Sequence, residues 1–311
     1  MRRAFSILGV WTVLGPGCGP GESDAGSDAG ARDGTATDAG VDPDSIQAVH
    51  TGHLFSCVTM GDQRLRCWGD VPDGLPSRLP EGSLPVVAFR RLCALGSDQR
   101  VSCFGEEWPT EVPAPEVRFR SLRSGSTHIC GLTVGGEGLC WGSDRGQLDV
   151  PMGMLLAEID PGFDHTCGLL DSGEVRCWGA SDFAGRLVTP PGAHTSLSTE
   201  GNGSCVLDAR GTATCWGDVS FGHLSPPDLF YQAIWVGAGG ISCGREAGAN
   251  LVCWGDDVVT EPKANLAPLP VERSFRLLSI AAQACGVTDD GRVRCWGRDD
   301  VGQATPPDDL L

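Results

Sequence analysis

The sequence predicts an all-β protein, a seven-bladed β-propeller with one disulfide-linked hairpin in each blade. Fourteen of the 15 cysteines form seven pairs with C-x9-C spacing, and the pairs recur every 36 to 42 residues. An aromatic residue followed by Gly comes directly after each second cysteine. Because a period in this range is typical of solenoids and propellers, each pair marks one repeat. The pairs are Cys57/Cys67, Cys93/Cys103, Cys130/Cys140, Cys167/Cys177, Cys205/Cys215, Cys243/Cys253 and Cys285/Cys295.

Each pair brackets a predicted β-hairpin. Gly136, Gly173, Gly211 and Gly291 lie six residues after the first cysteine, where a three-residue hairpin loop needs a left-handed residue. Counting outward from such a loop places the two cysteines opposite each other at a non-hydrogen-bonded pair, with Cα atoms about 4.5 Å apart. A disulfide tolerates this separation. The register therefore predicts that every cysteine of the seven pairs is bridged within its own hairpin.

Both faces of these hairpins are apolar, as in a sheet that is buried on two sides. One face carries the cysteines, and the other carries the aromatic column Trp68, Phe104, Trp141, Trp178, Trp216, Trp254 and Trp296. An earlier strand is expected in each repeat, because an apolar residue precedes the first cysteine by eight positions at Val49, Leu122, Ile159, Leu197, Trp235 and Leu277, while Pro85 takes this place in repeat 2. Pro-containing segments after the hairpins can add a short outer strand, since Pro is tolerated there. Blades of three or four strands, closed into a ring, satisfy this pattern.

The domain organisation follows from composition. Residues 1–18 read as a secretory signal, with Arg2 and Arg3 before a short apolar run. Cys18, the unpaired cysteine, is predicted to carry the lipid of a bacterial lipoprotein; an ordinary signal peptide is the alternative, because Leu14 lies four residues before Cys18 and a lipobox prefers three. Residues 19–45 form a low-complexity acidic linker. The propeller occupies 46–311, with repeats near 46–83, 84–116, 117–154, 155–193, 194–228, 229–270 and 271–311.

The charge balance limits the partners. The net charge is −17, and Lys263 is the one lysine in the sequence. Nucleic acid is not an expected ligand, because affinity for nucleic acid comes largely from cationic side chains. Electrostatic docking on an anionic membrane is not expected either, so contact with a membrane would occur only through the lipid anchor. We expect an exported protein, either an outer-membrane or cell-surface lipoprotein or a secreted protein.

The segment Trp296-Gly-Arg-Asp-Asp-Val-Gly-Gln303 resembles the regulator of chromosome condensation repeat, as do Gly125-Ser-Thr-His-Ile-Cys and Gly162-Phe-Asp-His-Thr-Cys upstream of other hairpins. The short period is most similar to the β-lactamase-inhibitory-protein type II branch of that superfamily. The resemblance implies a seven-bladed propeller over residues 46–311 that binds proteins through its faces. It is uneven, because repeats 2 and 6 lack the Gly-Gln and the paired cysteines are not part of the general pattern. The nuclear exchange-factor function is not carried over to an exported, acidic chain.

The residues predict no catalytic centre, metal site or cofactor. Structural zinc sites use C-x2-4-C pairs, and redox centres use C-x-x-C, whereas this chain has neither spacing. His128 and His165 both stand two residues before a first cysteine and are expected to pack inside the blades. No nucleophile motif accompanies a histidine, so we expect a protein that is not an enzyme.

Three aromatic residues are candidate binding residues. Trp108, Phe183 and Phe221 stand in turns that follow hairpins and belong to no repeated column. Exposed aromatics are enriched at the energetic centres of interfaces, although packing at the rim against a neighbouring blade is an equally good interpretation. Trp235 is expected in the core. The expected function is a surface-displayed module that binds a protein partner; the alternatives are a carbohydrate-binding or carbohydrate-active envelope propeller that takes polysaccharide, and a passive spacer.

Overall fold

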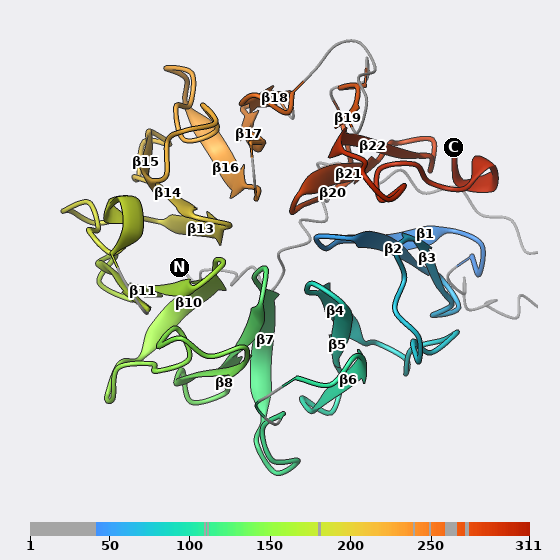
Figure 1. The fold of residues 1–311 in the computed structure, drawn as a ribbon, viewed down its shortest axis with the longest axis horizontal. Helices are drawn as coiled ribbons and strands as arrows, with labels where there is room; N and C mark the ends of the chain where they lie inside the picture. Colours follow the sequence, from blue (N-terminus) through green and yellow to red (C-terminus); the bar gives the residue numbers. More distant parts are fainter. Residues whose placement is uncertain are drawn as a thin grey trace, which may run out of the picture.

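Seven antiparallel sheets are arranged around a central axis, each with one strand edge toward the axis (Figure 1). This arrangement confirms the predicted all-β, seven-bladed propeller. The structure is a computed structural model, which describes residues 42–108, 110, 112–179, 182–238, 240–248, 250–258, 266–270 and 274–311. Cys18, the predicted signal and nearly all of the predicted linker lie outside the described residues.

Each blade has an inner, a middle and a third strand in chain order. The inner strands are β1 (Ile46–Thr51), β4 (Leu84–Val87), β7 (Phe119–Ser124), β10 (Leu156–Pro161), β13 (Ser196–Glu200), β16 (Tyr231–Val236) and β20 (Leu277–Ile280). The middle strands are β2 (Phe55–Met60), β5 (Arg91–Leu95), β8 (His128–Thr133), β11 (His165–Leu170), β14 (Gly203–Leu207), β17 (Ser242–Glu246) and β21 (Gln283–Val287). The third strands are β3 (Leu65–Gly69), β6 (Val101–Gly105), β9 (Gly138–Gly142), β12 (Val175–Gly179), β15 (Ala213–Gly217), β18 (Leu251–Trp254) and β22 (Val293–Arg298).

Within the described residues, a fourth strand occurs in blade 7 alone. β19 (Leu266–Ala267) pairs with β22, although repeat counting assigns residues 229–270 to the preceding blade. In blade 3, the Pro-containing segment 146–151 does not form a strand. The described residues also contain two single turns of 3-10 helix, η1 (Phe183–Gly185) and η2 (Asp308–Leu310).

The disulfides connect the middle and third strands of every blade, as the register predicted. In each hairpin the two cysteines lie directly opposite each other. All seven bridges are formed, with Cα–Cα distances of 4.0–4.1 Å. Because each bridge stays within one hairpin, a blade is cross-linked without help from its neighbours. The bridges are Cys57–Cys67, Cys93–Cys103, Cys130–Cys140, Cys167–Cys177, Cys205–Cys215, Cys243–Cys253 and Cys285–Cys295.

The two cysteines of a bridge differ in burial, so the expectation that the hairpins are buried on both faces is wrong for part of the third strands. The first cysteines, on the middle strands, are fully buried. The second cysteines are only half-buried, because the third strand lies farthest from the axis in six of the seven blades and is less covered by neighbouring blades. These half-buried residues are Cys67, Cys103, Cys140, Cys177, Cys215, Cys253 and Cys295.

The hairpin loops use left-handed residues, but these are not always glycine. Gly136, Gly173, Gly211 and Gly291 have φ angles of 85–88°, as predicted. In blades 1 and 2 the equivalent residues are Gln63 and Gln99, with φ angles of 67° and 66°. Left-handed backbone is unfavourable for a residue with a Cβ atom, so these two loops carry a local conformational cost.

We expect Gln99→Gly to stabilise the protein by about 0.5–1 kcal/mol, because the relief of left-handed strain exceeds the entropic cost of glycine. The Gln99 side chain is exposed, and the loop bonds come from its backbone, whose N–H donates to the carbonyl of Gly96 and whose carbonyl accepts from Phe119. Urea unfolding would measure the change. Gly291→Gln is the matched reverse, since open space surrounds the position of its Cβ atom, and this variant should lose stability. A stabilising Gly291→Gln would contradict the strain argument.

Adjacent blades are joined by a repeated tryptophan hydrogen bond. The indole N–H of Trp178 donates to the carbonyl of Gln147 in the preceding blade (3.0 Å), and Trp68 donates in the same way to Gln303 (3.0 Å). The Gln side chain shapes the accepting loop, because Gln147 Oε1 accepts from the N–H of Arg145 and Nε2 donates to the carbonyl of Ser143. The Gly-Gln motif therefore presents a carbonyl to the next blade.

Arg186 and His223 provide the accepting carbonyl in blades 4 and 5, although neither is Gln. Blades 2 and 6 lack the motif. In the described part of the chain, the indole nitrogens of Trp141 and Trp296, which follow those blades, have no hydrogen-bond partner.

The ring closes where blade 7 meets blade 1, near the C-terminus (Figure 1). One hydrophobic cluster spans both blades and includes Val49, Trp68, Val287 and Leu310. Around it, Ser56 Oγ donates to the Gln303 carbonyl at 2.9 Å. The first and last blades thus meet through both apolar packing and hydrogen bonds.

The expected apolar column is wrong in register in the last two blades. Opposite the residue after the first cysteine stand Val49, Leu122, Ile159 and Leu197 in four blades, but Ile234 and Leu278 in blades 6 and 7. The turn between inner and middle strands is one residue longer in blade 6 and one shorter in blade 7. Trp235 consequently lies opposite Cys243 and is half-buried.

Candidate functional site

A cavity of about 800 Å³ runs along the axis and is lined by the inner strands of all seven blades. The register places one residue of each blade at the same depth, opposite the first cysteine. These residues are His50, Val86, Arg123, Asp160, Ser198, Trp235 and Ser279. Five of these seven side chains are polar, while Val86 and the half-buried Trp235 are apolar.

Several of these polar groups cap the free edge of the next inner strand. Asp160 Oδ2 accepts the backbone N–H of Thr199 at 2.7 Å, and Ser198 Oγ accepts that of Val236 at 2.9 Å. Ser279 Oγ accepts the N–H of Thr51 at 3.0 Å across the ring closure. An inner strand has no partner on its axial side, so these side chains satisfy donors that a further strand would otherwise take.

At one end of the cavity, a hydrogen-bond chain joins the inner turns of blades 1, 3 and 5. The Ser126 hydroxyl donates to Glu200 Oε1 at 2.7 Å and lies 2.7 Å from His53 Nε2. A catalytic triad needs the carboxylate to orient the histidine, which in turn takes the serine proton. Here the serine donates to the carboxylate, and Ser126 is only 1% exposed. The chain therefore serves to hold three blades together.

Burial moves the pKa values of the enclosed groups in opposite directions. Burial raises the pKa of Asp160 to about 8, while nearby Arg123 and the N–H of Thr199 act to lower it. Burial lowers the pKa of His128 and of His165 to about 3. Both histidine side chains lie fully inside the blade stack, as predicted, with Nε2 next to a Thr or Ser hydroxyl of the following blade.

We expect Asp160→Asn to remove a loss of stability that the wild type shows as pH rises toward about 8. The folded carboxyl holds its proton up to a pKa of about 8, while its ordinary value is 3.8, so the folded state binds more protons between these values. Stability therefore falls as pH rises through this range. Asn keeps an acceptor for the Thr199 N–H but does not titrate. Chemical unfolding between about pH 6 and pH 9 should show the wild type losing stability relative to the variant; parallel profiles would contradict the assignment.

The buried histidines give the opposite slope at acidic pH. Their folded pKa values of about 3 lie below the ordinary 6.5, so the unfolded chain binds more protons between them. The neutral histidines therefore contribute stability above their ordinary pKa of 6.5, and this contribution is lost as pH falls toward their folded pKa of about 3. Together with Asp160, this places the expected optimum near neutral pH.

The second candidate region is the end of the ring where the inner strands turn into the middle strands and the third strands end. We call this end the turn face. Phe183 and Phe221, both predicted binding residues, lie here and are 55% and 44% exposed. Trp108 is different, because it is half-buried and packs with the cluster of blades 2 and 3. The Arg91 guanidinium lies 5.4 Å from the Trp108 ring centroid.

The turn face also exposes apolar residues that the sequence analysis did not single out. Phe89 and Phe163 occupy the inner turns of blades 2 and 4, and Val219 and Val301 lie in the loops after the third strands of blades 5 and 7; all are 39–63% exposed. A sequence signal existed for the first two, since both stand four residues before a first cysteine, in a turn where polar residues are usual.

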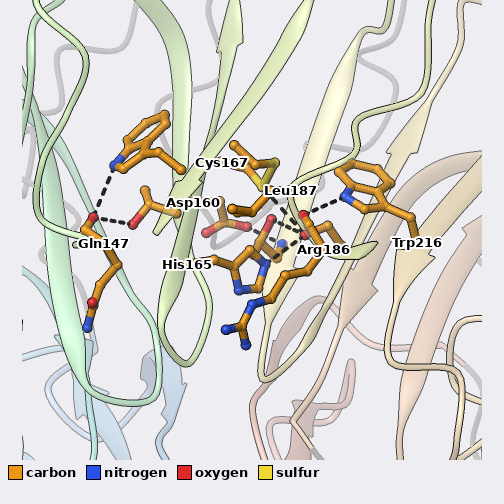
Figure 2. Close-up of a disulfide and its surroundings, with 12 residues drawn as sticks. Gln147, Asp160, His165, Cys167, Arg186, Leu187 and Trp216 are labelled. Atoms are coloured by element: carbon orange, nitrogen blue, oxygen red, sulfur yellow. Dashed lines mark hydrogen bonds between the residues drawn. A yellow bond between two sulfur atoms is a disulfide. The ribbon is translucent and has the colours of Figure 1, made fainter. Parts of the chain in front are cut away.

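Phe163, Phe183, Val219 and Phe221 lie on the adjacent blades 4 and 5, and we call them the blade 4–5 patch. Figure 2 shows the Arg186 side chain, whose buried guanidinium links the Phe183 loop to the inner turns of blades 4 and 5. Arg186, 3% exposed, forms an ion pair with Asp164 at 2.5 Å, donates to Asn202 Oδ1 at 3.0 Å and lies 5.7 Å from the Phe183 ring centroid.

The backbone continues this connection. The N–H of Phe163 donates to the carbonyl of Gly201 at 2.7 Å, and that of Asp218 donates to Asn202 at 3.0 Å. The N–H of Asp256 in blade 6 donates to the carbonyl of Phe221. The patch is therefore presented on loops that are cross-connected rather than independent.

Two further classes of site find no support in the described residues. No group of three His, Cys, Asp or Glu side chains in that part of the chain could hold a metal ion. The cysteines of the seven pairs are all oxidised, so none is available as a thiolate ligand or nucleophile. None of the described helices is long and apolar enough to cross a membrane.

Comparison with known proteins agrees with this architecture. A family model of the Regulator of chromosome condensation (RCC1) repeat matches residues 159–184 and 284–303. The ectodomain of the Physcomitrella patens receptor kinase CR4 superposes with a TM-score of 0.67 at 22% identity, covering 82% of this chain and 73% of that one. The CRINKLY WD40 ectodomain of the Arabidopsis thaliana receptor kinase ACR4 gives 0.64 at 19% identity, covering 81% and 95%.

Prp20p from Saccharomyces cerevisiae, the yeast RCC1, gives a TM-score of 0.60 at 13% identity, covering 80% of this chain and 82% of that one. That structure is described together with the binding of Prp20p to Gsp1p and histones, and a second structure has Prp20 bound to Kap60. Identities this low establish the fold alone. The seven sheets and these neighbours show a β-propeller whose fold is similar to that of RCC1, and the repeat match shows two segments similar to the RCC1 repeat.

Proposed function

We propose that this protein is an exported, non-catalytic binding module that engages a protein partner through loops of the turn face. The observation that carries the proposal is the exposure of Phe183 and Phe221 on loops fixed by hydrogen bonds between blades. Aromatic side chains that are rigidly held and exposed lose little entropy when a partner covers them. RCC1-like neighbours such as Prp20p bind proteins, which supports the same class of function.

Export is supported by the cysteines and by the N-terminal sequence. Seven intradomain disulfides are typical of proteins that fold in an oxidising compartment. In this proposal, residues 1–18 direct export, Cys18 carries a lipid, and residues 19–45 act as a flexible tether. Mass spectrometry of the mature N-terminus would test it: a diacylglyceryl-modified Cys18 supports the anchor, and cleavage without modification indicates a secreted form.

The experiment that tests binding is capture of native envelope components on the oxidised, full mature chain. The comparison is with the variant Phe183→Ala/Phe221→Ala and with Phe230→Ala. Phe230 is 69% exposed at the opposite end of the ring, where it pairs with Thr212 just before β16, and is therefore a matched control. A partner lost by the double variant and kept by the control supports the proposal. If neither the wild type nor either variant retains a protein, the result favours a passive spacer.

A second candidate, saccharide binding, is favoured by the axial cavity. Its wall combines the half-buried Trp235 and aliphatic side chains with Glu158, Asp160 and hydroxyl groups, and such a mixture of apolar and polar groups suits a polyhydroxylated ligand. Calorimetric titration with purified envelope polysaccharide and its oligosaccharides would test it. Saturable binding that is lost on Trp235→Ala supports this candidate, and absence of heat at any concentration removes it.

A further inference from the structure

The blade 4–5 patch combines apolar exposure with a strong imbalance of charge. Carboxylates on the turn face greatly outnumber guanidinium groups; they are Asp70, Glu106, Glu107, Asp144, Asp164, Asp182, Asp218, Asp256, Asp257, Asp299 and Asp300, against Arg90, Arg91, Arg145, Arg186 and Arg298. The imbalance follows from the composition of the loops after the third strands.

The few arginines of the turn face are mostly neutralised within it. Arg90 forms ion pairs with both Asp70 and Glu106. Arg298 Nε lies 3.5 Å from Asp300, and Arg186 is buried against Asp164. Near the patch, the carboxylates of Asp182 and Asp256 stay exposed. A binding partner would thus meet negative charge around the four apolar side chains.

The face of the ring opposite the turn face is also acidic, but its arginines are paired with carboxylates at the surface. Its arginines form surface pairs with local carboxylates, as in Arg64 with Asp44 and Asp62, and Arg66 with Asp309. Exposed cations are therefore interspersed among the carboxylates there, whereas the blade 4–5 patch has none in its own loops apart from the buried Arg186.

We propose that the blade 4–5 patch is the docking site for a cationic, partly apolar segment of a partner protein. In this arrangement Lys or Arg side chains meet Asp182 and Asp256, and apolar side chains of the partner cover Phe163, Phe183 and Phe221. The inference rests on the proposed function and adds the face, the position and the chemistry of the partner. Complementary charge would steer the encounter, and the phenylalanines would supply most of the lasting affinity.

Synthetic peptides that alternate Arg with Leu or Tyr are the probe, paired with peptides in which Glu replaces each Arg. Fluorescence anisotropy with the oxidised mature chain should show binding of the Arg peptides alone, weakened by salt. Phe183→Ala/Phe221→Ala should weaken binding about tenfold or more, as expected for interface hot spots. Asp182→Asn/Asp256→Asn should weaken binding less but should flatten its salt dependence; the amide oxygen introduced at position 182 can still accept the Leu187 N–H that Asp182 holds.

The controls are Phe230→Ala and Asp171→Asn on the opposite face, each of which should bind like the wild type. Circular dichroism and the absence of free thiols among the fourteen paired cysteines verify that every variant is folded. Equal losses in the opposite-face variants would show nonspecific attraction to an acidic protein and would overturn the inference. Capture of a protein partner that is insensitive to the patch variants would also overturn it, while leaving the proposed function in place.

Discussion

Reduction of the seven disulfides is expected to unfold the propeller at room temperature. Each bridge closes a loop between cysteines 10 residues apart in sequence. In the chain-entropy model such a loop contributes roughly 2–3 kcal/mol. Even with incomplete additivity, seven such contributions exceed about 10 kcal/mol, which is comparable to the whole stability of a typical domain.

Thermal melts followed by circular dichroism, with and without a phosphine reductant, would measure this effect. Removal of one bridge, by Cys167→Ala/Cys177→Ala, is the graded control and should lower the melting temperature without unfolding the chain. The Cys167 sulfur is buried beside the hydroxyl of Ser204 and Cys177 is half-buried, so Ala at these positions leaves no charged group behind. A reduced protein that melts within a few degrees of the oxidised one would contradict the expected dominance of the bridges.

The second large effect is expected at Arg186. Arg186→Met should destabilise the protein by about 3 kcal/mol, because it leaves Asp164 buried without its cationic partner. The value lies at the lower end for a buried pair, since the Asp164 side chain is 15% exposed and retains some contact with water. The backbone carbonyl of residue 186 still accepts from Trp216, so the loss should report on the side chain (Figure 2).

A double-mutant cycle in urea isolates this ion pair. Arg186→Gln/Asp164→Asn removes both charges and introduces the Gln found at the equivalent positions of blades 3 and 7, Gln147 and Gln303. The double variant should be more stable than either Arg186→Gln or Asp164→Asn alone. Additive losses across the cycle would mean that the two side chains do not stabilise each other.

Sequence reasoning reached the features that depend on local register. The position of Gly173 in its loop fixes which residues face each other, and the Cys167–Cys177 bridge follows from that count. It also reached the buried places of His128 and His165, because alternation along a strand assigns each residue a face.

Prediction from the sequence was wrong where the turns differ in length between blades. Trp235 was assigned to the apolar column, but one additional residue in the turn of blade 6 moves Ile234 into that column and places Trp235 opposite Cys243. The left-handed Gln63 and Gln99 were also missed, because no glycine marks those positions.

Contacts between blades could not be predicted from one repeat at a time. The Arg186–Asp164 pair joins the loop after β12 to the inner turn of the same blade and reaches Asn202 in the next, and none of these residues recurs in a pattern. The chain His53–Ser126–Glu200 draws on three non-adjacent blades. Such sites depend on ring closure, which places residues far apart in sequence next to one another.

The candidate binding residues could also be predicted only in part, because their neighbours come from different blades. Phe183 and Phe221 stood out because they belong to no column, and the structure exposes both on the turn face. Phe163 is held against blade 5 by the bond from its N–H to the carbonyl of Gly201, a contact between two blades that the sequence does not reveal.

Each blade is closed by its own disulfide, and together the seven bridges are expected to supply much of the stability of the ring that carries the turn face. Proteolytic mapping of the exported protein by mass spectrometry, with thiols blocked and no reductant added, tests this pairing most directly. The account predicts seven linked peptide pairs, each joining the two cysteines of one hairpin, from Cys57–Cys67 to Cys285–Cys295. Bridges between different blades, or alkylation of any of these fourteen cysteines in the folded protein, would contradict it.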